Sequence, residues 1–230
     1  SRSSIRYQDD WFYASLGYGV IQKMKSGNTE FLSPGGPYSD GTGKMVSYGN
    51  KLVIAGGSML EEGGVTYSYN GYYVYEEGQW WSSLRHGIPA LDTMYDIHAM
   101  AIDPSSGDLW LAALEQGIVR MREANPLEVY TEQNSPIELR ITKMVTGLQV
   151  DKKRNLWVSN FESGSPLYVK SPTGQWDSFP AINAQASKVL DLLIDRSGQK
   201  WMRFADGLTT SPGIIVYSDN NTPFDKSDDP

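Results

Sequence analysis

The hydrophobic residues of this chain fall into short runs separated by turns, and one arrangement of runs recurs. In residues 97–122 (IHAMAIDPSSGDLWLAALEQGIVRMR), a first apolar run ends in a polar turn, a second begins at Leu109-Trp110, and a third follows a short break. The pattern returns as TGLQVDKKRNLWVSN and as LDLLIDRSGQKWMRF, so a tryptophan opens a strand about every 45 residues. Short apolar runs bounded by turn residues are typical of β-strands. The pattern therefore predicts a repeated unit of short β-strands.

Each repeat also carries an aspartate at the end of its first strand and a turn before its tryptophan. The aspartate can accept hydrogen bonds from its own turn, and glycine supplies the positive φ that tight turns need. One wide apolar ring per repeat is expected to pack between neighbouring sheets, with ligand stacking as the alternative. The structural repeat residues are Asp103, Gly107, Trp110, Asp151, Trp157, Asp195, Gly198 and Trp201.

This period and strand content predict an all-β fold, a β-propeller built from four-stranded blades. About five blade repeats are present, since the second-strand marks fall at Trp11, Val53, Trp110, Trp157 and Trp201. We expect part of a larger propeller, forming an open array or an imperfectly closed ring with exposed sheet edges. The predicted domains are 1–43 (a partial first blade or blades), 44–217 (propeller blades) and 218–230 (an acidic linker or tail). Residues 56–64 are expected to be an inserted, protruding loop.

Composition narrows the function classes. The chain has 230 residues and is 40% hydrophobic, enough for a large all-β core. Its net charge of −7 disfavours nucleic acid, whose phosphates attract a basic surface. No apolar run is long enough for a membrane span. There are no cysteines, and therefore no disulfide framework or thiolate zinc site.

The expected strand topology predicts that one end of the blades is the binding surface. Because strands alternate in direction, the links between second and third strands gather at one end, together with the segments that enter each blade. These links are longer and more varied than the turns, as recognition loops are. The alternative is that acidic loops only keep the surface solvated. The candidate binding residues on these loops are Glu61, Glu62, Glu115, Glu162 and Asp206.

The stretch VTYSYNGYYVY (65–75) is rich in tyrosine. Strand periodicity places Tyr67 and Tyr69 on one face, as it does Tyr73 and Tyr75. An exposed aromatic row would suit sugar rings, whereas cross-strand packing is the alternative. Only two histidines occur, one of them His98, so we expect structural or solvent-facing histidines instead of a metal triad or catalytic dyad.

The acidic C-terminal stretch, residues 219–230, suggests a calcium loop. Its oxygen-bearing side chains are of the type that Ca²⁺ prefers, although they lack the spacing of an EF-hand. A solvated acidic linker is the alternative, and no other cofactor is expected. The candidate ligands are Asp219, Asn221, Asp225 and Asp228.

The motif D-x-x-G-x-x-W, followed by a strand and G-(I/L)-x-(V/R), resembles the two-component regulator propeller repeat of periplasmic sensor halves of hybrid histidine kinases, chiefly from Bacteroidetes. A closer resemblance is to PorZ-type proteins of the type IX secretion system. It is carried, in this order, by KLVIAGG (51–57), NGYYVYEEGQWW (70–81), DIHAMAIDPSSGDLW (96–110) and GIIVYSDNNTPFDKSDD (213–229). Ser218 and Asn221 depart from the closing signature of that family.

The PorZ-like resemblance implies a large protein of the cell envelope, in the periplasm or at the outer-membrane surface. It implies a non-enzymatic binding or scaffold role in secretion-linked attachment of cargo to anionic lipopolysaccharide, so the expected partners are a glycan, lipopolysaccharide or other secretion-system proteins. The regulator repeat implies instead a glycan-sensing propeller in signal transduction.

A propeller glycosidase or lyase is the third alternative. The Asp195–Gly198 turn has one residue more than the sialidase Asp box and lacks its threonine, and no pattern unites the arginines. A lyase would need a base facing the channel, a position open to His98. The sequence predicts no catalytic residue, and we expect no enzyme.

Overall fold

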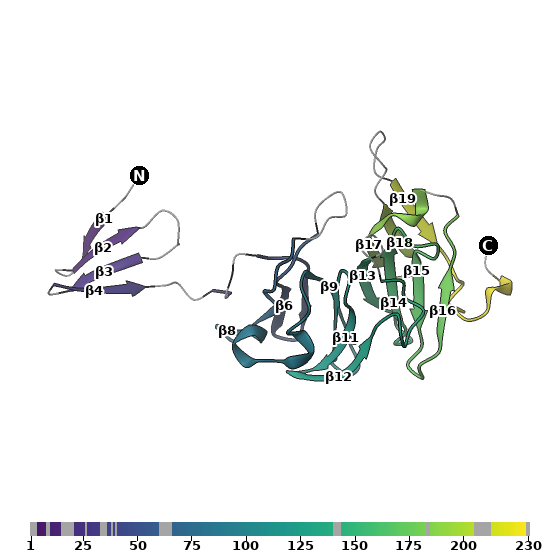
Figure 1. Ribbon diagram of the computed structural model, residues 1–230, viewed down its shortest axis with the longest axis horizontal. Coiled ribbons are helices and arrows are strands. Elements are labelled where there is room, and N and C mark those ends of the chain that lie inside the picture. Colours follow the sequence, from purple (N-terminus) through teal and green to yellow (C-terminus); the bar gives the residue numbers. More distant parts are fainter. Residues whose placement is uncertain are drawn as a thin grey trace. The chain divides into compact units, whose positions relative to one another are not determined.

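The computed structural model describes residues 4–7, 10–14, 21–25, 27–32, 36–37, 39, 41–59, 66–139, 144–182, 185–204 and 213–228. The chain divides into two compact units, Ser1–Pro37 and Tyr38–Pro230. Within the described ranges, the regular elements are strands and short 3-10 helices, so the predicted all-β fold is confirmed (Figure 1).

The first unit contains one antiparallel sheet with its four strands in chain order. Trp11 lies on the second strand, opposite Arg6 and Met24, at the position that the repeat predicted. The strands are β1 (Ser4–Tyr7), β2 (Asp10–Ala14), β3 (Ile21–Lys25) and β4 (Asn28–Leu32).

The second unit contains four antiparallel sheets, each made of consecutive strands, and these are the predicted propeller blades. Blade I comprises β5 (Met45–Tyr48), β6 (Lys51–Ala55), β7 (Tyr72–Glu76) and β8 (Gln79–Ser82). Blade II comprises β9 (Ile97–Ile102), β10 (Leu109–Ala113), β11 (Gly117–Arg122) and β12 (Asn125–Tyr130). Blade III comprises β13 (Met144–Val150), β14 (Leu156–Phe161), β15 (Leu167–Lys170) and β16 (Trp176–Phe179). Blade IV has three described strands, β17 (Val189–Ile194), β18 (Lys200–Phe204) and β19 (Gly213–Tyr217). The short 3-10 helices are Ser83–His86, Pro89–Leu91, Gln185–Ser187 and Lys226–Asp228.

Neighbouring blades pack face to face, and an apolar cluster fills each of the three spaces between them. The middle strands β10 and β14 are buried at every position because they are covered on both faces. A propeller core is thus a series of layers between sheets, and strands with apolar residues on both faces are its sequence signature.

The second-strand marks lie in these layers. Val53, Trp110 and Trp157 each belong to the cluster shared with the following blade. Trp201 differs, since 39% of its surface is exposed. The prediction that every repeat tryptophan packs between two sheets is therefore wrong for Trp201, because no following blade among the described residues covers it.

Two of the repeat aspartates, Asp151 and Asp195, bind the indole of their repeat as well as their own turn. Asp151 accepts hydrogen bonds from the turn backbone at Lys153 and Asn155, and its other oxygen accepts one from Trp157 Nε1 at 2.9 Å. Asp195 binds Trp201 Nε1 at the same distance. Hydrogen bonds from Ser197 and Trp201 lower the pKa of Asp195 to about 2. One carboxylate thus fixes both the turn and the orientation of the indole.

The loop of residues 56–64, which was expected to protrude, follows β6 within blade I and lies partly against the core. Met59 is partly buried on a cluster formed by Leu114, Met144, Phe161 and Leu190 of blades II, III and IV. Burial of its flexible apolar side chain keeps this part of the loop packed against the core. Residues 60–65 lie outside the described residues.

The C-terminal segment is also not a free, solvated tail. Asp219 is buried and forms an ion pair with Lys200 Nζ at 2.5 Å, while Phe224 packs against the cluster between blades III and IV. Lys226 Nζ contacts Asp177 on β16 at 2.7 Å. A buried carboxylate requires such a partner, and these contacts attach residues 219–226 to the two last blades.

Candidate functional site

Three tyrosines meet at the end of blades I and II that carries the links between second and third strands, which we call the loop face. Tyr67 and Tyr69 lie in the link between β6 and β7, and Tyr95 precedes β9. The ring centroid of Tyr95 lies 5.1 Å from that of Tyr67 and 5.6 Å from that of Tyr69. We call these three residues the tyrosine cluster.

The cluster offers aromatic surface to solvent. Tyr67 is 64% exposed and Tyr69 is 53% exposed, whereas Tyr95 is half-buried and donates its hydroxyl to Glu115 Oε2 at 2.5 Å. Burial and the Glu115 carboxylate raise the pKa of Tyr95 to about 12, so its phenol remains protonated at neutral pH. The site combines two open rings with a carboxylate at its edge.

A single buried aspartate holds the segment that carries Tyr67. The carboxylate of Asp96 accepts hydrogen bonds from the backbone nitrogens of Thr66, Tyr67 and Ser68 at 2.7, 2.8 and 2.9 Å, and another from the Thr66 hydroxyl. Its own backbone nitrogen donates to Ser68 O at 2.8 Å. These bonds hold Tyr67 at a φ of 53°, which L-residues rarely adopt. Asp96 therefore fixes the geometry of the cluster.

Close backbone contacts also hold the segment around Asp96 in place. Gly57 donates to Ile97 O at 2.9 Å, and a Cβ on Gly57 would lie 2.5 Å from Asp96 Cα. Only glycine permits that approach. Asn70 Nδ2 bonds both Gly56 O and Ser68 Oγ. The backbone that carries the rings is thus hydrogen-bonded to several neighbouring groups.

Asp96 was not predicted from the sequence as a site residue. Its partners are separated from it by about thirty residues of chain, as the bonds to Thr66 and Ser68 show. Asp96 directly precedes an apolar strand, and no sequence motif around it indicates that it would bind a distant loop. Tyr67 and Tyr69 were singled out by their alternation, although the structure places them in a link and not in a strand.

Of the five acidic residues predicted to bind a ligand, the structure describes two, and they lie in different loops. Glu115 belongs to the site beside Tyr95. Glu162 lies in the link after β14 and pairs with Lys188 Nζ at 3.4 Å. Glu61, Glu62 and Asp206 lie outside the described residues. The structure therefore joins one of the predicted acidic residues to the aromatic rings.

Two of the predicted calcium ligands, Asp219 and Asp225, are engaged by other groups of the protein. Asp219 Oδ1 is engaged by Lys200, and Asp225 Oδ1 by the backbone and hydroxyl of Ser227. The side chain of Asp228 lies outside the described residues. No group of three histidines or acidic residues suited to a metal ion occurs in the described ranges. Calcium binding remains a prediction.

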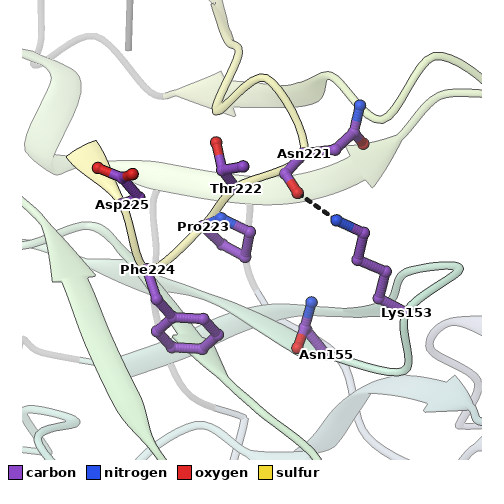
Figure 2. A pocket seen from close by; sticks show the side chains of 7 residues that line it. All are labelled: Lys153, Asn155, Asn221, Thr222, Pro223, Phe224 and Asp225. Carbon is purple, nitrogen blue, oxygen red and sulfur yellow. Dashed lines mark hydrogen bonds between the residues drawn. The ribbon is translucent and has the colours of Figure 1, made fainter. Parts of the chain in front are cut away.

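An open pocket of about 350 Å³ lies at the opposite end of the blades, between the Asp151 turn and the C-terminal segment (Figure 2). Two of its polar side chains are engaged within the protein, because Lys153 Nζ binds Asn221 O and Asn155 Nδ2 binds Asp151. The lining residues are Lys153, Asn155, Asn221, Thr222, Pro223, Phe224 and Asp225.

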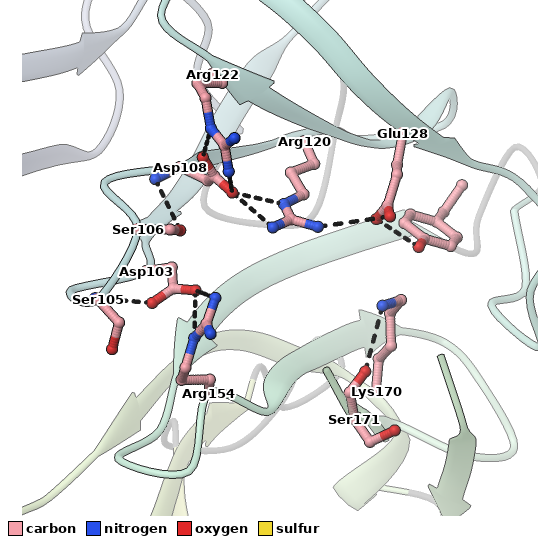
Figure 3. A network of polar contacts seen from close by, with 11 residues as sticks. Asp103, Ser105, Ser106, Asp108, Arg120, Arg122, Glu128, Arg154, Lys170 and Ser171 are labelled. Carbon is pink, nitrogen blue, oxygen red and sulfur yellow. Dashed lines mark hydrogen bonds and ion pairs between the residues drawn. The ribbon is translucent and has the colours of Figure 1, made fainter. Parts of the chain in front are cut away.

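The arginines near this end form structural ion pairs (Figure 3). Asp108 is fully buried and accepts hydrogen bonds from Arg120 and Arg122. Asp103 of blade II pairs with Arg154 of blade III at 2.8 Å. Burial alone would raise the pKa of each carboxyl, but the guanidinium groups hold both pKa values below the ordinary range. These pairs fix turns and join two blades.

Comparison with known proteins gives a likeness in fold. No family model matches the sequence, and no curated protein matches it. No helix among the described residues has the length and hydrophobicity needed to cross a bilayer.

Solved structures do match. One of them is PorZ, described as a bacterial surface component of the type IX secretion system of Porphyromonas gingivalis. The two structures match with a TM-score of 0.68 at 15% sequence identity, and the match covers 98% of this chain and 36% of the PorZ chain. Extracellular domains of two putative regulators of B. thetaiotaomicron are also similar. For BT4673 the TM-score is 0.53 at 12% identity (94% and 31% covered), and for BT3049 it is 0.52 at 14% (93% and 28%).

The similar structures also include an enzyme, the luciferin-regenerating enzyme, with a TM-score of 0.50 at 10% identity. The chain spans about a third of the length of PorZ and of the regulator domains. Identities this low show the fold alone. The structure is therefore that of a β-propeller similar to PorZ and to the extracellular domains of regulators, as the sequence resemblance predicted.

Proposed function

We propose that this chain is a non-enzymatic propeller segment of a bacterial cell-envelope protein, and that it binds a glycan at the tyrosine cluster. The observation that carries the proposal is the pair of exposed rings, Tyr67 and Tyr69, on a segment whose backbone nitrogens at Tyr67 and Ser68 bind the buried carboxylate of Asp96. Rings that are fixed before binding lose little conformational entropy when a ligand stacks on them.

The chemistry of the cluster favours a sugar. A pyranose has apolar C–H faces that pack on aromatic rings and a rim of hydroxyls that bind carboxylates and phenols. Glu115 and the hydroxyl of Tyr95 provide such groups beside the rings. Because the chain carries a net charge of −7, a neutral glycan suits this surface better than a phosphorylated one. Anionic lipopolysaccharide is therefore the second ligand to test.

Two kinds of envelope protein could use this glycan-binding activity. Similarity to PorZ supports a role in scaffolding or cargo recognition at the bacterial surface, with other secretion-system proteins as further partners. Similarity to the extracellular regulator domains supports a glycan-sensing propeller as the second candidate. In both settings we place the ligand on the same loop face, and both agree with an envelope location.

The test is a binding screen with neutral oligosaccharides and with lipopolysaccharide, each with and without calcium. Tyr67→Ala and Tyr69→Ala should each weaken glycan binding about tenfold, the size of one lost stacking contact. Tyr48→Ala is the matched control, because this tyrosine is also exposed but lies at the turn end of β5. Absence of glycan binding, or an equal loss in the control, would contradict the proposal.

The non-enzymatic part has its own test, since an enzyme is among the similar structures. Any glycan that binds is incubated with the protein, and the products are separated by chromatography. We expect the glycan to be recovered intact. Cleavage that disappears in His98→Asn would favour a glycosidase or lyase.

A further inference from the structure

The two carboxylates at the tyrosine cluster have no cation beside them. Asp96 is fully buried, and its hydrogen-bond donors, three backbone nitrogens and the Thr66 hydroxyl, are all neutral. The donor at Glu115 is the neutral phenol of Tyr95. Within the described ranges, neither carboxylate lies within ion-pair distance of a lysine or an arginine. Two negative charges therefore lie close to the exposed rings without compensation.

This lack of a basic partner distinguishes Asp96 from other buried aspartates of the same chain. Asp108 and Asp219 are similarly buried, and each forms an ion pair with an arginine or a lysine. Burial of a carboxylate is costly, and a close positive charge offsets part of this cost. The tyrosine cluster is therefore a place where a positive charge brought by a ligand would be stabilised.

Two basic side chains near Asp96 do not supply this charge. His98 Nδ1 lies 3.3 Å from Asp96 O, but burial lowers the pKa of His98 to about 4, so its ring is neutral at neutral pH. Lys44 donates its backbone nitrogen to His98 O, but its ammonium group is paired with Asp191 of blade IV at 2.5 Å. The charge of Lys44 is thus compensated elsewhere.

The rings and a neighbouring amide also favour a ligand that brings donors and positive charge. Tyr67 and Tyr69 are exposed, and the face of an aromatic ring attracts an ammonium group. The side-chain oxygen of Gln116, which follows Glu115, is buried and accepts no hydrogen bond within the described residues. The site thus offers acceptors and negative charge. An ammonium group has donors only and therefore complements it.

A metal ion fits these groups less well. Calcium takes about six to eight oxygen ligands, whereas both oxygens of Asp96 already accept hydrogen bonds from the backbone. No group of three histidines or acidic residues suited to a metal occurs in the part of the chain that the structure describes. A sugar with a primary amine, in contrast, combines C–H faces for the rings with an ammonium group at its edge.

We propose that the glycan bound at the tyrosine cluster contains an amino sugar with a free, protonated amine, which stacks on Tyr67 or Tyr69 and directs its ammonium group to Glu115. This inference rests on the proposed glycan binding and names the class of sugar. Acetylation of the amine removes the positive charge and leaves the sugar ring in place, so an acetylated sugar should bind more weakly.

Two trimers with the same backbone test the inference, β-1,4-linked glucosamine and its fully N-acetylated counterpart. Their affinities are measured by isothermal titration calorimetry at about pH 5.5, where the amine is protonated and the carboxylates are ionised. The glucosamine trimer should bind about five- to tenfold more tightly, the size of one cation–π contact with one exposed ion pair. Equal affinities, or tighter binding of the acetylated trimer, would overturn the inference and leave glycan binding itself intact.

Further ligands separate the inference from the proposed function. If neutral oligosaccharides bind and neither trimer does, the amino sugar is wrong and glycan binding stands. If no glycan binds, both are wrong. Trilysine carries ammonium groups without a sugar ring, and it should bind about tenfold more weakly than the glucosamine trimer because it cannot stack on the rings. Equal binding of trilysine would show recognition of a basic peptide and would overturn the inference.

Glu115→Gln tests the partner of the ammonium group, because glutamine keeps an acceptor for the Tyr95 hydroxyl and removes the charge. The preference for the glucosamine trimer over the acetylated trimer should fall to within about twofold. Glu162→Gln is the matched control on the same loop face, because its carboxylate is already paired with Lys188 at 3.4 Å, and it should keep the preference. An unchanged preference in E115Q would overturn the inference.

Salt dependence gives a test that needs no substitution. Sodium chloride screens exposed charges, so adding it should weaken binding of the glucosamine trimer and leave binding of the acetylated trimer unchanged. The same salt dependence for both trimers would contradict an ammonium group bound at the site.

Discussion

At the scale of single residues, the repeat tryptophans have one chemical identity but two environments. Trp157 is fully buried between blades III and IV, whereas Trp201 has one face in solvent. Both keep the bond to their turn aspartate. Burial of the ring, which Trp157 has and Trp201 lacks, is therefore a large difference between the two sites.

Because of this difference, Trp157→Ala should cost about 3–5 kcal/mol of unfolding free energy, the usual cost of removing a buried aromatic side chain. Trp201→Ala should cost well under half of that, because much of its ring is already in water. Urea unfolding of both variants measures the difference. Equal losses would mean that Trp201 is covered in solution.

His98 gives the chain a dependence of stability on pH. Burial lowers the pKa of His98 to about 4, and neighbouring Lys44 acts in the same direction, while Asp96 opposes it. Between pH 6.5 and pH 4 the unfolded chain takes up a proton that the folded chain excludes, so stability falls as the pH falls. The loss from this residue is on the order of 3 kcal/mol.

The measurement is urea unfolding of the protein and of His98→Asn at pH 7 and pH 4.5. Aspartates and glutamates contribute to acid sensitivity in both proteins, so the informative quantity is the difference between them. The variant should lose less stability than the parent over this range. Identical pH profiles would show that His98 is accessible to protons in the folded state.

At the scale of elements, the C-terminal segment depends on one buried ion pair. Lys200 and Asp219 are both almost inaccessible to solvent and lie 2.5 Å apart. Removing one charge leaves the other buried without compensation, which is far more costly than losing a surface pair.

Asp219→Ala should therefore destabilise the protein by about 3–5 kcal/mol and release residues 219–226 from blade IV. Lys226→Ala, which removes the exposed pair with Asp177, is the control and should cost less than about 1 kcal/mol. Thermal unfolding gives the stabilities, and amide hydrogen exchange shows whether the segment is released. A comparable effect of the two substitutions would argue against a structural function of the buried pair.

The tyrosine-bearing link is a second element held by one side chain. Asp96→Ala removes the acceptor for three backbone nitrogens, so residues 66–69 should exchange amide hydrogens faster and glycan binding should weaken. Gln149→Ala, on the neighbouring inner strand β13, serves as a control for general loss of packing. Unchanged exchange at residues 66–69 would show that other contacts fix this link.

At the scale of the whole second unit, the blades differ in how completely they are covered. Within the second unit, blades II and III each share an apolar cluster on both faces, whereas the described cluster of blade IV lies on the side of blade III. Opening a local region exposes more apolar surface where cover is complete. Amides of β14 should therefore exchange more slowly than those of β18. The opposite order would indicate that blade IV is covered in solution.

Much of this fold was predictable because its information is local. Strand alternation, the Asp-to-Trp spacing and the turn residues are fixed by φ/ψ preferences and by neighbouring side chains, so Trp110, Trp157 and Trp201 marked their strands correctly. The burial of Asp219 could not be read in this way, since an acidic stretch is usually solvated. Its partner Lys200 becomes adjacent only when β18 and the tail pack together.

The sequence by itself determined the repeat: the strands, their turns, the apolar positions on both faces and the resemblance to envelope propellers. The tertiary structure decided which of these residues meet. It brought the ring of Tyr95 into contact with those of Tyr67 and Tyr69, gave Asp96 its backbone donors, and left Trp201 partly exposed while burying Trp157. The physical reason is range: turn and strand preferences act over a few residues, whereas desolvation and hydrogen bonding at the site depend on groups brought together by the packing of blades.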